Sequence, residues 1–187
     1  MPKLIFVQKN LLTCIKEYEL DGILNAANGI GVMGAGIAGA IRTAGGYEIQ
    51  RDAMQVCKNF DPKEGEAYVT ISGSLEGHGI KNIIHAVVMK QPGGKTSYEI
   101  IDKAFTSALI KAKECGIKKL GCTALGTGVG RLNPEKVAEH MYTVAMEQDI
   151  DIVFADFSST FIKSLNKCDE FFLGVKNANV QEDEIPI

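Results

Sequence analysis

Residues 25–42 decide the fold, and they read Asn-Ala-Ala-Asn-Gly-Ile-Gly-Val-Met-Gly-Ala-Gly-Ile-Ala-Gly-Ala-Ile-Arg. A short apolar run, Gly22–Asn25, leads into this stretch, and Ala35–Ala44 has the composition of a helix. The stretch therefore predicts a strand, a glycine-rich loop and a helix. Glycine permits positive φ angles and close approach of the backbone to a ligand. The N-terminus of the following helix presents free N–H groups, so this loop is suited to binding a phosphate.

A second segment, residues 123–132, repeats this arrangement with the sequence Thr-Ala-Leu-Gly-Thr-Gly-Val-Gly-Arg-Leu. It lies between a strand predicted at Lys119–Ala124 and a helix predicted at Asn133–Glu147. One glycine-rich loop between a strand and a helix is often no more than a tight turn. Two of them at the carboxyl ends of strands in one sheet indicate a shared ligand cleft. A pair of phosphate loops predicts a diphosphate ligand.

The rest of the chain predicts an α/β fold, because short apolar runs alternate with longer segments of helical period. Further strands are predicted at Leu4–Gln8, Ala67–Ser72, Asn82–Val88 and Ile150–Ala155, and further helices at Tyr47–Asn59, Ser97–Cys115 and Ser158–Asn166. The middle strands are apolar at nearly every position, so we expect helices on both of their faces. Residues 1–175 are expected to form one domain, followed by a polar, acidic tail at 176–187.

Composition narrows the function further. The net charge is −3, so no general nucleic-acid binding is expected, and any phosphate should be held locally by backbone amides. No apolar run approaches the ~18 residues of a membrane span, and no signal peptide is recognisable. The five scattered cysteines include no CxxC pair, which predicts buried thiols, a cytoplasmic location and no metal site.

The common nucleotide motifs do not fit. The chain lacks G-x-x-x-x-G-K-[ST], which argues against a P-loop NTPase. Gly34–Gly39 does spell G-x-G-x-x-G, but the loop is too long for the first turn of a Rossmann fold, and no acidic residue ends the next strand. A dinucleotide oxidoreductase is therefore the weakest alternative, since no acid–base pair for hydride transfer is visible either.

Three segments together resemble the macro domain family: Asn25–Asn28, Gly34–Ala38 and Ala124–Val129. The resemblance runs from about Leu4 to Leu165 and includes Gly65-Glu-Ala and Ile84-His-Ala-Val. Met33–Ala38 and Gly128–Leu132 are similar to the branch of the terminal ADP-ribose glycohydrolases, whereas Asn25–Asn28 and Gly126-Thr-Gly are similar to the commoner branch. The resemblance implies a three-layer α/β/α fold with a mixed central sheet.

The resemblance also implies a ligand, ADP-ribose or a derivative of it, with no cofactor, and mono-ADP-ribosylated proteins as partners. Loop 31–38 would surround the diphosphate and the distal ribose, and loop 126–131 would close over the phosphates. Asn10 and Phe157 would contact the adenine. The residues implied to contact the ligand are Asn10, Leu11, Asn25, Asn28, Gly34, Ala35, Gly36, Ile37, Ala38, Gly126, Thr127, Gly128, Val129, Gly130, Arg131 and Phe157.

Several of these residues have a structural alternative. Asn28 would hydrogen-bond the distal ribose, or cap a turn with its side chain. Phe157 would stack on the adenine, or pack in the core. Arg131 would reach a phosphate, or remain a solvated loop charge. His85 lies in an apolar strand, which favours a core histidine over a catalytic one.

Catalysis is where the chain departs from the family pattern. Ala38 stands where hydrolytic members of the common branch have an Asp, and Gly130 where the glycohydrolase branch has one. Lys90 matches the lysine of that branch only approximately. A general base typically contributes ~10²–10⁴-fold to rate. The sequence therefore favours a binding module with weak hydrolysis, in which Asn28 is the only candidate catalytic residue. The alternative is an efficient hydrolase that removes ADP-ribose from proteins or phosphate from ADP-ribose 1″-phosphate.

Overall fold

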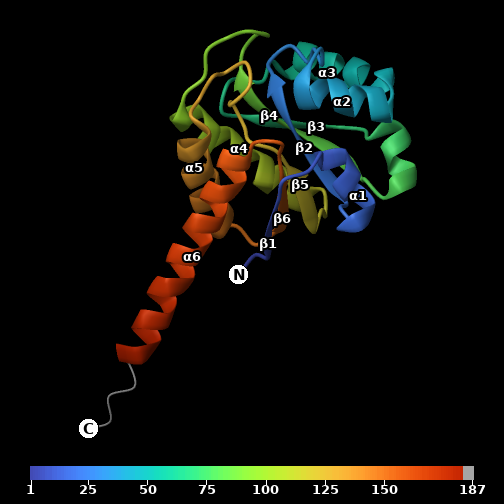
Figure 1. Ribbon diagram of the computed structural model, residues 1–187. Coiled ribbons are helices and arrows are strands. Elements are labelled where there is room, and N and C mark those ends of the chain that lie inside the picture. Colours follow the sequence, from blue (N-terminus) through green and yellow to red (C-terminus); the bar gives the residue numbers. More distant parts are fainter. Residues whose placement is uncertain (183–187) are drawn as a thin grey trace.

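The apolar runs form one six-stranded sheet in the computed structural model, which describes residues 1–182 (Figure 1). The strands are β1 (Leu4–Val7), β2 (Gly22–Asn28), β3 (Ala67–Thr70), β4 (Asn82–Met89), β5 (Lys119–Cys122) and β6 (Asp151–Ala155). Their order across the sheet is β1-β6-β5-β2-β4-β3. Every pair is parallel except β3 with β4, which is antiparallel. The predicted mixed sheet is confirmed.

Helices cover both faces of this sheet, as Figure 1 shows. One layer contains α1 (Cys14–Glu17), α2 (Gly36–Gly45) and α3 (Tyr47–Phe60), and the other contains α4 (Tyr98–Glu114), α5 (Pro134–Met146) and α6 (Ser159–Glu182). Successive strand residues point to opposite faces. Ile23 therefore packs in the cluster beneath α1 and α2, whereas Leu24 packs in the cluster beneath α4 and α5. The three-layer α/β/α architecture is confirmed.

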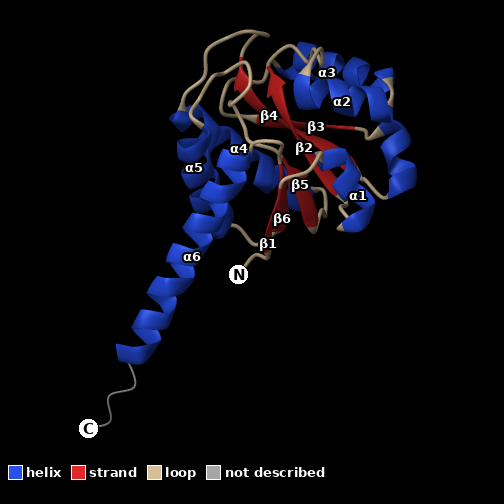
Figure 2. Ribbon diagram, in the orientation of Figure 1, coloured by secondary structure: helices blue, strands red, loops and turns tan. Residues whose placement is uncertain are grey.

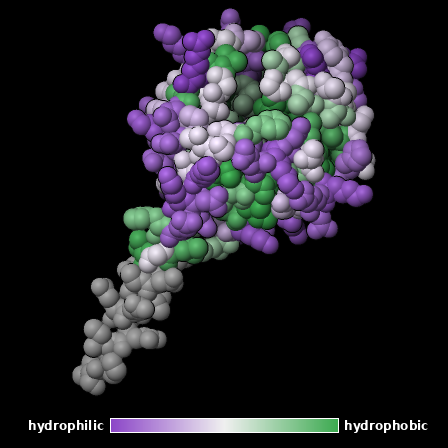
Figure 3. All heavy atoms as spheres, viewed as in Figure 1, coloured by the Kyte–Doolittle hydropathy of each residue, from purple (hydrophilic) through white to green (hydrophobic). Residues whose placement is uncertain are grey.

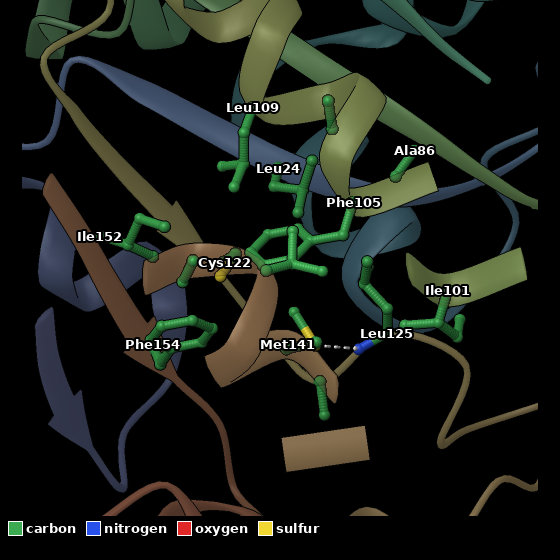
Figure 4. Packing of buried hydrophobic residues seen from close by; sticks show 14 of the residues in the cluster. Leu24, Ala86, Ile101, Phe105, Leu109, Cys122, Leu125, Met141, Ile152 and Phe154 are labelled. Atoms are coloured by element: carbon green, nitrogen blue, oxygen red, sulfur yellow. Dashed lines mark hydrogen bonds between the residues drawn. The ribbon is translucent and has the colours of Figure 1, made fainter. Parts of the chain in front are cut away.

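The core beneath α4 and α5 is dense and aromatic (Figure 4). The rings of Phe105 and Phe154 lie 6.2 Å apart between centroids, and Phe161 approaches Phe154 at the same distance. Met141 of α5 extends into this cluster, where its sulfur accepts from the Leu125 N–H at 3.5 Å. The start of the second glycine-rich loop is thus anchored in the core.

Two of the predicted helices, α4 and α5, begin with a side-chain cap. Ser97 Oγ accepts from the Ile100 N–H at 3.2 Å, and Asn133 Oδ1 accepts from Glu135 and Lys136 at the start of α5. Such caps satisfy N–H groups that have no partner within the helix.

Three parts of the fold differ from the prediction: the end of β2, the short helical turns and the length of α6. Strand β2 continues three residues beyond Asn25, because its ladder with β4 runs on to Asn28 opposite Met89. The short helical turns at Leu11–Glu17 and Gly73–His78 lack the length that gives a clear helical period.

Helix α6 was predicted to end at Asn166 but continues to Glu182. Cys168 and Phe172 pack against the core, and Tyr142 donates a hydrogen bond to Asp169 at 3.0 Å. The helix then projects from the body (Figure 1), and hydrophobic residues are exposed where it leaves (Figure 3). The first part of the predicted tail is therefore helical, and residues 183–187 lie outside the described residues. The domain boundary at residue 175 stays a prediction.

Candidate functional site

The cleft begins where two neighbouring strands separate. Strands β2 and β5 pair only at Gly22 with Leu120 and at Ile23 with Gly121. Beyond these pairs the strands diverge, and the residues that follow on each side line a cleft of about 680 Å³. The cleft lies at the carboxyl ends of the parallel strands, where the loops gather (Figure 2). Ligands of open α/β sheets bind at this edge.

All the residues implied to contact a ligand line this cleft, except Asn25 and Arg131. The sequence reasoning therefore located the cleft, although ligand contact by each residue stays a prediction. Further lining residues were not predicted from the sequence. Most have small or apolar side chains, and one is a lysine and one an aspartate: Lys9, Ala26, Ala27, Val32, Ala40, Val88, Met89, Pro92, Gly93, Thr123, Ala124, Ala155 and Asp156.

The first loop ends at a helix N-terminus that no side chain caps. Ala35 is the N-cap of α2 and makes no side-chain hydrogen bond. The amides of Gly36, Ile37 and Ala38 therefore lack acceptors within the helix, and all three residues line the cleft. Gly36 has a φ of 57°, a conformation that side chains disfavour. This turn offers uncompensated donors and the positive end of a helix dipole to an anion.

Asn28 braces the first loop with its side chain. Its Nδ2 donates to Val32 O at 2.8 Å, and its Oδ1 accepts from the Ile30 and Val32 N–H groups, each at 3.2 Å. Gln50 supports the same loop from α3 by accepting from the Met33 N–H at 2.8 Å. The turn-capping role of Asn28 is thus observed. One amide hydrogen of Asn28 remains for a ligand, and the role toward a ribose stays a prediction.

The second loop is compact. Gly126 has a φ of 71°, and a Cβ there would lie 2.9 Å from Ile101 Cδ1. Leu132 N–H donates to Gly126 O at 3.0 Å, which closes the loop. Arg131 is exposed, takes a left-handed conformation with φ of 54°, and lies outside the cleft lining. Position 128 differs, because a Cβ at Gly128 would meet no atom within 4 Å.

The far end of the cleft lies after β1 and β6. Phe157 is 74% exposed, so it is not a core residue, and its ring is available to a ligand. Asn10 lines the cleft and uses Oδ1 to accept from the Leu12 N–H at 2.9 Å. The amide oxygen that was expected to recognise an adenine amino group therefore already has one donor, and its second lone pair remains.

Asp156 is the lining residue whose omission matters most. One carboxylate oxygen accepts from the Ala124 N–H at 3.0 Å and the other from the Ser158 N–H at 2.7 Å. It therefore ties the second loop to the start of α6. The sequence signal was available, since Asp156 is an acidic residue directly after a buried strand.

Asn25 lies in the protein interior and not in the cleft. It is 1% exposed, and its Nδ2 donates to His85 Nδ1 at 3.0 Å across the β2–β4 pair. Nε2 of His85 therefore carries the proton and donates to Thr70 Oγ1 at 2.8 Å, and Thr70 donates to Ile71 O. Burial lowers the pKa of His85 to about 3. The expected core histidine is confirmed, and it is neutral.

The cleft holds little charge of its own. Of its lining residues only Lys9 and Asp156 are charged, and Lys9 forms an ion pair with Glu17 at 2.8 Å. Within residues 1–182, no group of three His, Cys, Asp or Glu side chains is arranged to hold a metal ion. No helix in this range is long and apolar enough to cross a membrane. An anion in the cleft would therefore be held by backbone amides.

The macro domain family model matches residues 24–141, from β2 through both glycine-rich loops into α5. The chain belongs to the macro domain family. Its likeness to one branch of the family stays a prediction.

Sequence relatives of this macro domain occur in several organisms. A protein of Aquifex aeolicus is 38% identical over 128 residues, covering 68% of this chain and 73% of its own length. A protein of Aeropyrum pernix is 37% identical over 124 residues, covering 66% of this chain and 62% of its own. In a Mycobacterium tuberculosis relative, 40% identical, the match covers 62% of this chain and only 30% of that protein.

Solved macrodomains share the fold. The macrodomain of Mycobacterium tuberculosis DarG superposes with a TM-score of 0.72 at 23% identity, covering 84% of this chain and all of that one. A mutant macrodomain of Oceanobacillus iheyensis with ADPR superposes with a TM-score of 0.73 at 19% identity, and the match covers 91% of this chain and 92% of that one. A Trypanosoma brucei macrodomain in complex with ADP-ribose superposes with a TM-score of 0.68 at 24% identity, and the match covers 88% of this chain and 67% of that one.

The His85 network predicts a pH-dependent stability. The unfolded chain binds a proton at His85 near pH 6.5, whereas the folded chain does so only near 3. The contribution of the neutral His85 to the free energy of unfolding is therefore complete above pH 6.5. Below that pH the free energy of unfolding falls by up to ~1.4 kcal/mol per pH unit. Urea unfolding of the wild type and of His85→Gln at several pH values between about pH 7 and about pH 5 measures the free energy of unfolding. This free energy should fall less steeply with decreasing pH in the variant than in the wild type. Equal slopes would contradict a buried neutral histidine.

Proposed function

We propose that this macro domain binds ADP-ribose in the cleft, with the diphosphate between loop 34–38 and loop 126–130. The observation that carries the proposal is the pair of glycine-rich backbones on opposite sides of one cleft, the first with uncapped amides. The ADP-ribose-bound macrodomains with the same fold support it. The adenine would lie between Asn10 and Phe157, and the distal ribose beside Asn28. ADP-ribosylated proteins would be the macromolecular partners.

We propose further that hydrolysis is slow. Ala38 and Gly130 both line the cleft and neither supplies a carboxylate. Asp156 is held by two backbone amides at the adenine end, away from the proposed distal ribose. Lys90 lines a different hollow and pairs with Asp61. Asn28 would then position water without acting as a general base, because an amide does not accept a proton at neutral pH.

Calorimetric titration of the wild-type protein tests the binding proposal. ADP-ribose should bind more tightly than ADP, and AMP most weakly, because AMP offers one phosphate to two loops and no distal ribose. NAD is the control for a dinucleotide site, since its nicotinamide would extend past the proposed distal ribose. Absence of ADP-ribose binding, or equal affinity for AMP, would rule the proposal out.

Gly128→Glu should abolish ADP-ribose binding while the protein stays folded. Position 128 has no atom within 4 Å of a Cβ and no left-handed φ, so a side chain fits without strain. A carboxylate there would repel the diphosphate. Gly128→Gln is the matched control with equal bulk and no charge, and it should weaken binding less. Retained affinity in a folded Gly128→Glu protein would mean that the diphosphate lies elsewhere.

Ala38→Asp should speed the release of ADP-ribose from a glutamate-modified protein. The position lies on the first turn of α2 and lines the cleft, so the carboxylate would stand beside the proposed distal ribose. A gain of ~10- to 100-fold is expected, below the ~10²–10⁴ of an evolved base, because supporting contacts are missing. Single-turnover release measures it, with Ala38→Asn as the uncharged control. Fast release by the wild type would instead favour an efficient hydrolase.

A further inference from the structure

A second hollow, of about 620 Å³, lies outside the cleft against α3. One side is the exposed face of α3 with Arg51, Met54 and Lys58, and the other side is formed by Ile30, Asp61 and Lys90. We call this hollow the α3 groove. Nothing in the proposed binding of ADP-ribose uses it.

The α3 groove and the cleft share a wall. Asn28 and Met89 line the cleft, and the residues that follow them in the sequence, Gly29 and Lys90, line the groove. The Gly29 N–H donates to the carbonyls of both Met89, at 3.0 Å, and Lys90, at 2.9 Å. The carboxyl ends of β2 and β4 therefore separate the two hollows by little more than a single backbone. The two hollows are therefore neighbours across this wall, and Asn28 and Gly29 mark the place where they come closest in the sequence.

The groove is basic although the chain is acidic. Its lining holds three cations, Arg51, Lys58 and Lys90, against the single carboxylate of Asp61, a local charge of +2 on a chain of net charge −3. Asp61 pairs with Lys90 and Lys63, which lower its pKa to about 2, so it remains ionised and holds Lys90 in place.

Arg51 and Lys58 are the cations available to a ligand. Both are exposed, and neither forms an ion pair with any residue whose side chain the structure describes. Met54 and Gln55 lie between them along α3, and Met54 and Ile30, on opposite sides of the groove, are 43% and 39% exposed. The groove therefore combines two exposed apolar side chains with free cations.

This chemistry fits a peptide with carboxylate side chains. Arginine binds carboxylates in a bidentate manner, and apolar side chains of a peptide would cover Ile30 and Met54. No aromatic side chain lines the groove, so unpaired nucleic-acid bases would find no stacking surface.

We infer that the α3 groove binds the acidic peptide segment next to an ADP-ribosylated side chain whose ADP-ribose occupies the cleft. The inference rests on the proposed function, because it requires the distal ribose to lie beside Asn28. The protein would then select its targets by the sequence around the modification as well as by the modification.

The test compares the double variant Arg51→Ala/Lys58→Ala with the wild type. The probes are free ADP-ribose, an ADP-ribosylated peptide with flanking Asp and Glu residues, and the same peptide with Asn and Gln in their place. The variant should bind the acidic peptide about five- to tenfold more weakly, the effect of two exposed ion pairs. Its affinities for free ADP-ribose and for the neutral peptide should stay unchanged. Lys163→Ala/Lys167→Ala, two exposed lysines on α6 in the opposite layer, makes the same charge change and should have no effect.

The two proposals fail separately. If the wild type does not bind free ADP-ribose, the proposed function is wrong. If the wild type binds free ADP-ribose, but the α3 and α6 double variants lower the affinity for the acidic peptide equally or not at all, the groove does not bind the peptide. An ADP-ribosylated single-stranded oligonucleotide is the remaining probe. If Arg51→Ala/Lys58→Ala lowers the affinity for this oligonucleotide as much as the affinity for the acidic peptide, the groove is not specific for a peptide and the assignment is overturned.

Discussion

The early separation of β2 from β5 is the constraint on which the site depends. Two pairs of residues hold these neighbouring strands together, and past them the ladder stops. Past this point β2 stays paired with β4 and β5 with β6, but the edges of β2 and β5 that face each other have no ladder partner, and buried backbone groups need partners. The glycine-rich loops follow the ends of β2 and β5, and each is anchored from beneath, the first by Gln50 and the second by the contact of Leu125 with Met141.

A cleft with few charges suits a protein of net charge −3. Amides at an uncapped helix N-terminus attract an anion without the basic field that would also attract nucleic acid nonspecifically. These donors are fixed by the fold, so the proposed binding of an anion would require little reorganisation. Selectivity then follows from shape and from the spacing of the two loops, and the free cations lie outside the cleft, on the edge of the α3 groove.

Two polar arrangements, one buried and one at the cleft wall, connect the elements around the site. His85 joins β2 to β3 through Asn25 and Thr70, and Tyr68 stacks on its ring at a centroid distance of 4.5 Å. Asp156 joins the second loop to α6 with a charge-assisted hydrogen bond from each of its oxygens. Asp156 lines the cleft and accepts from backbone amides, whereas the His85 network links side chains of neighbouring strands within the sheet.

The sequence by itself determined the fold class, both loops and about half of the cleft lining, because glycine spacing and hydrophobic period are local properties. Tertiary structure decided which polar residues face the cleft. Asn25 and Asn28 occur in one short motif, yet the register of β2 on β4 places Asn25 opposite His85 in the core and Asn28 at the strand end. The α3 groove joins residues from α3, the first loop and the end of β4, and the extent of α6 depends on its contacts with α5. Such contacts join residues far apart in the chain, so no local pattern of residues encodes them.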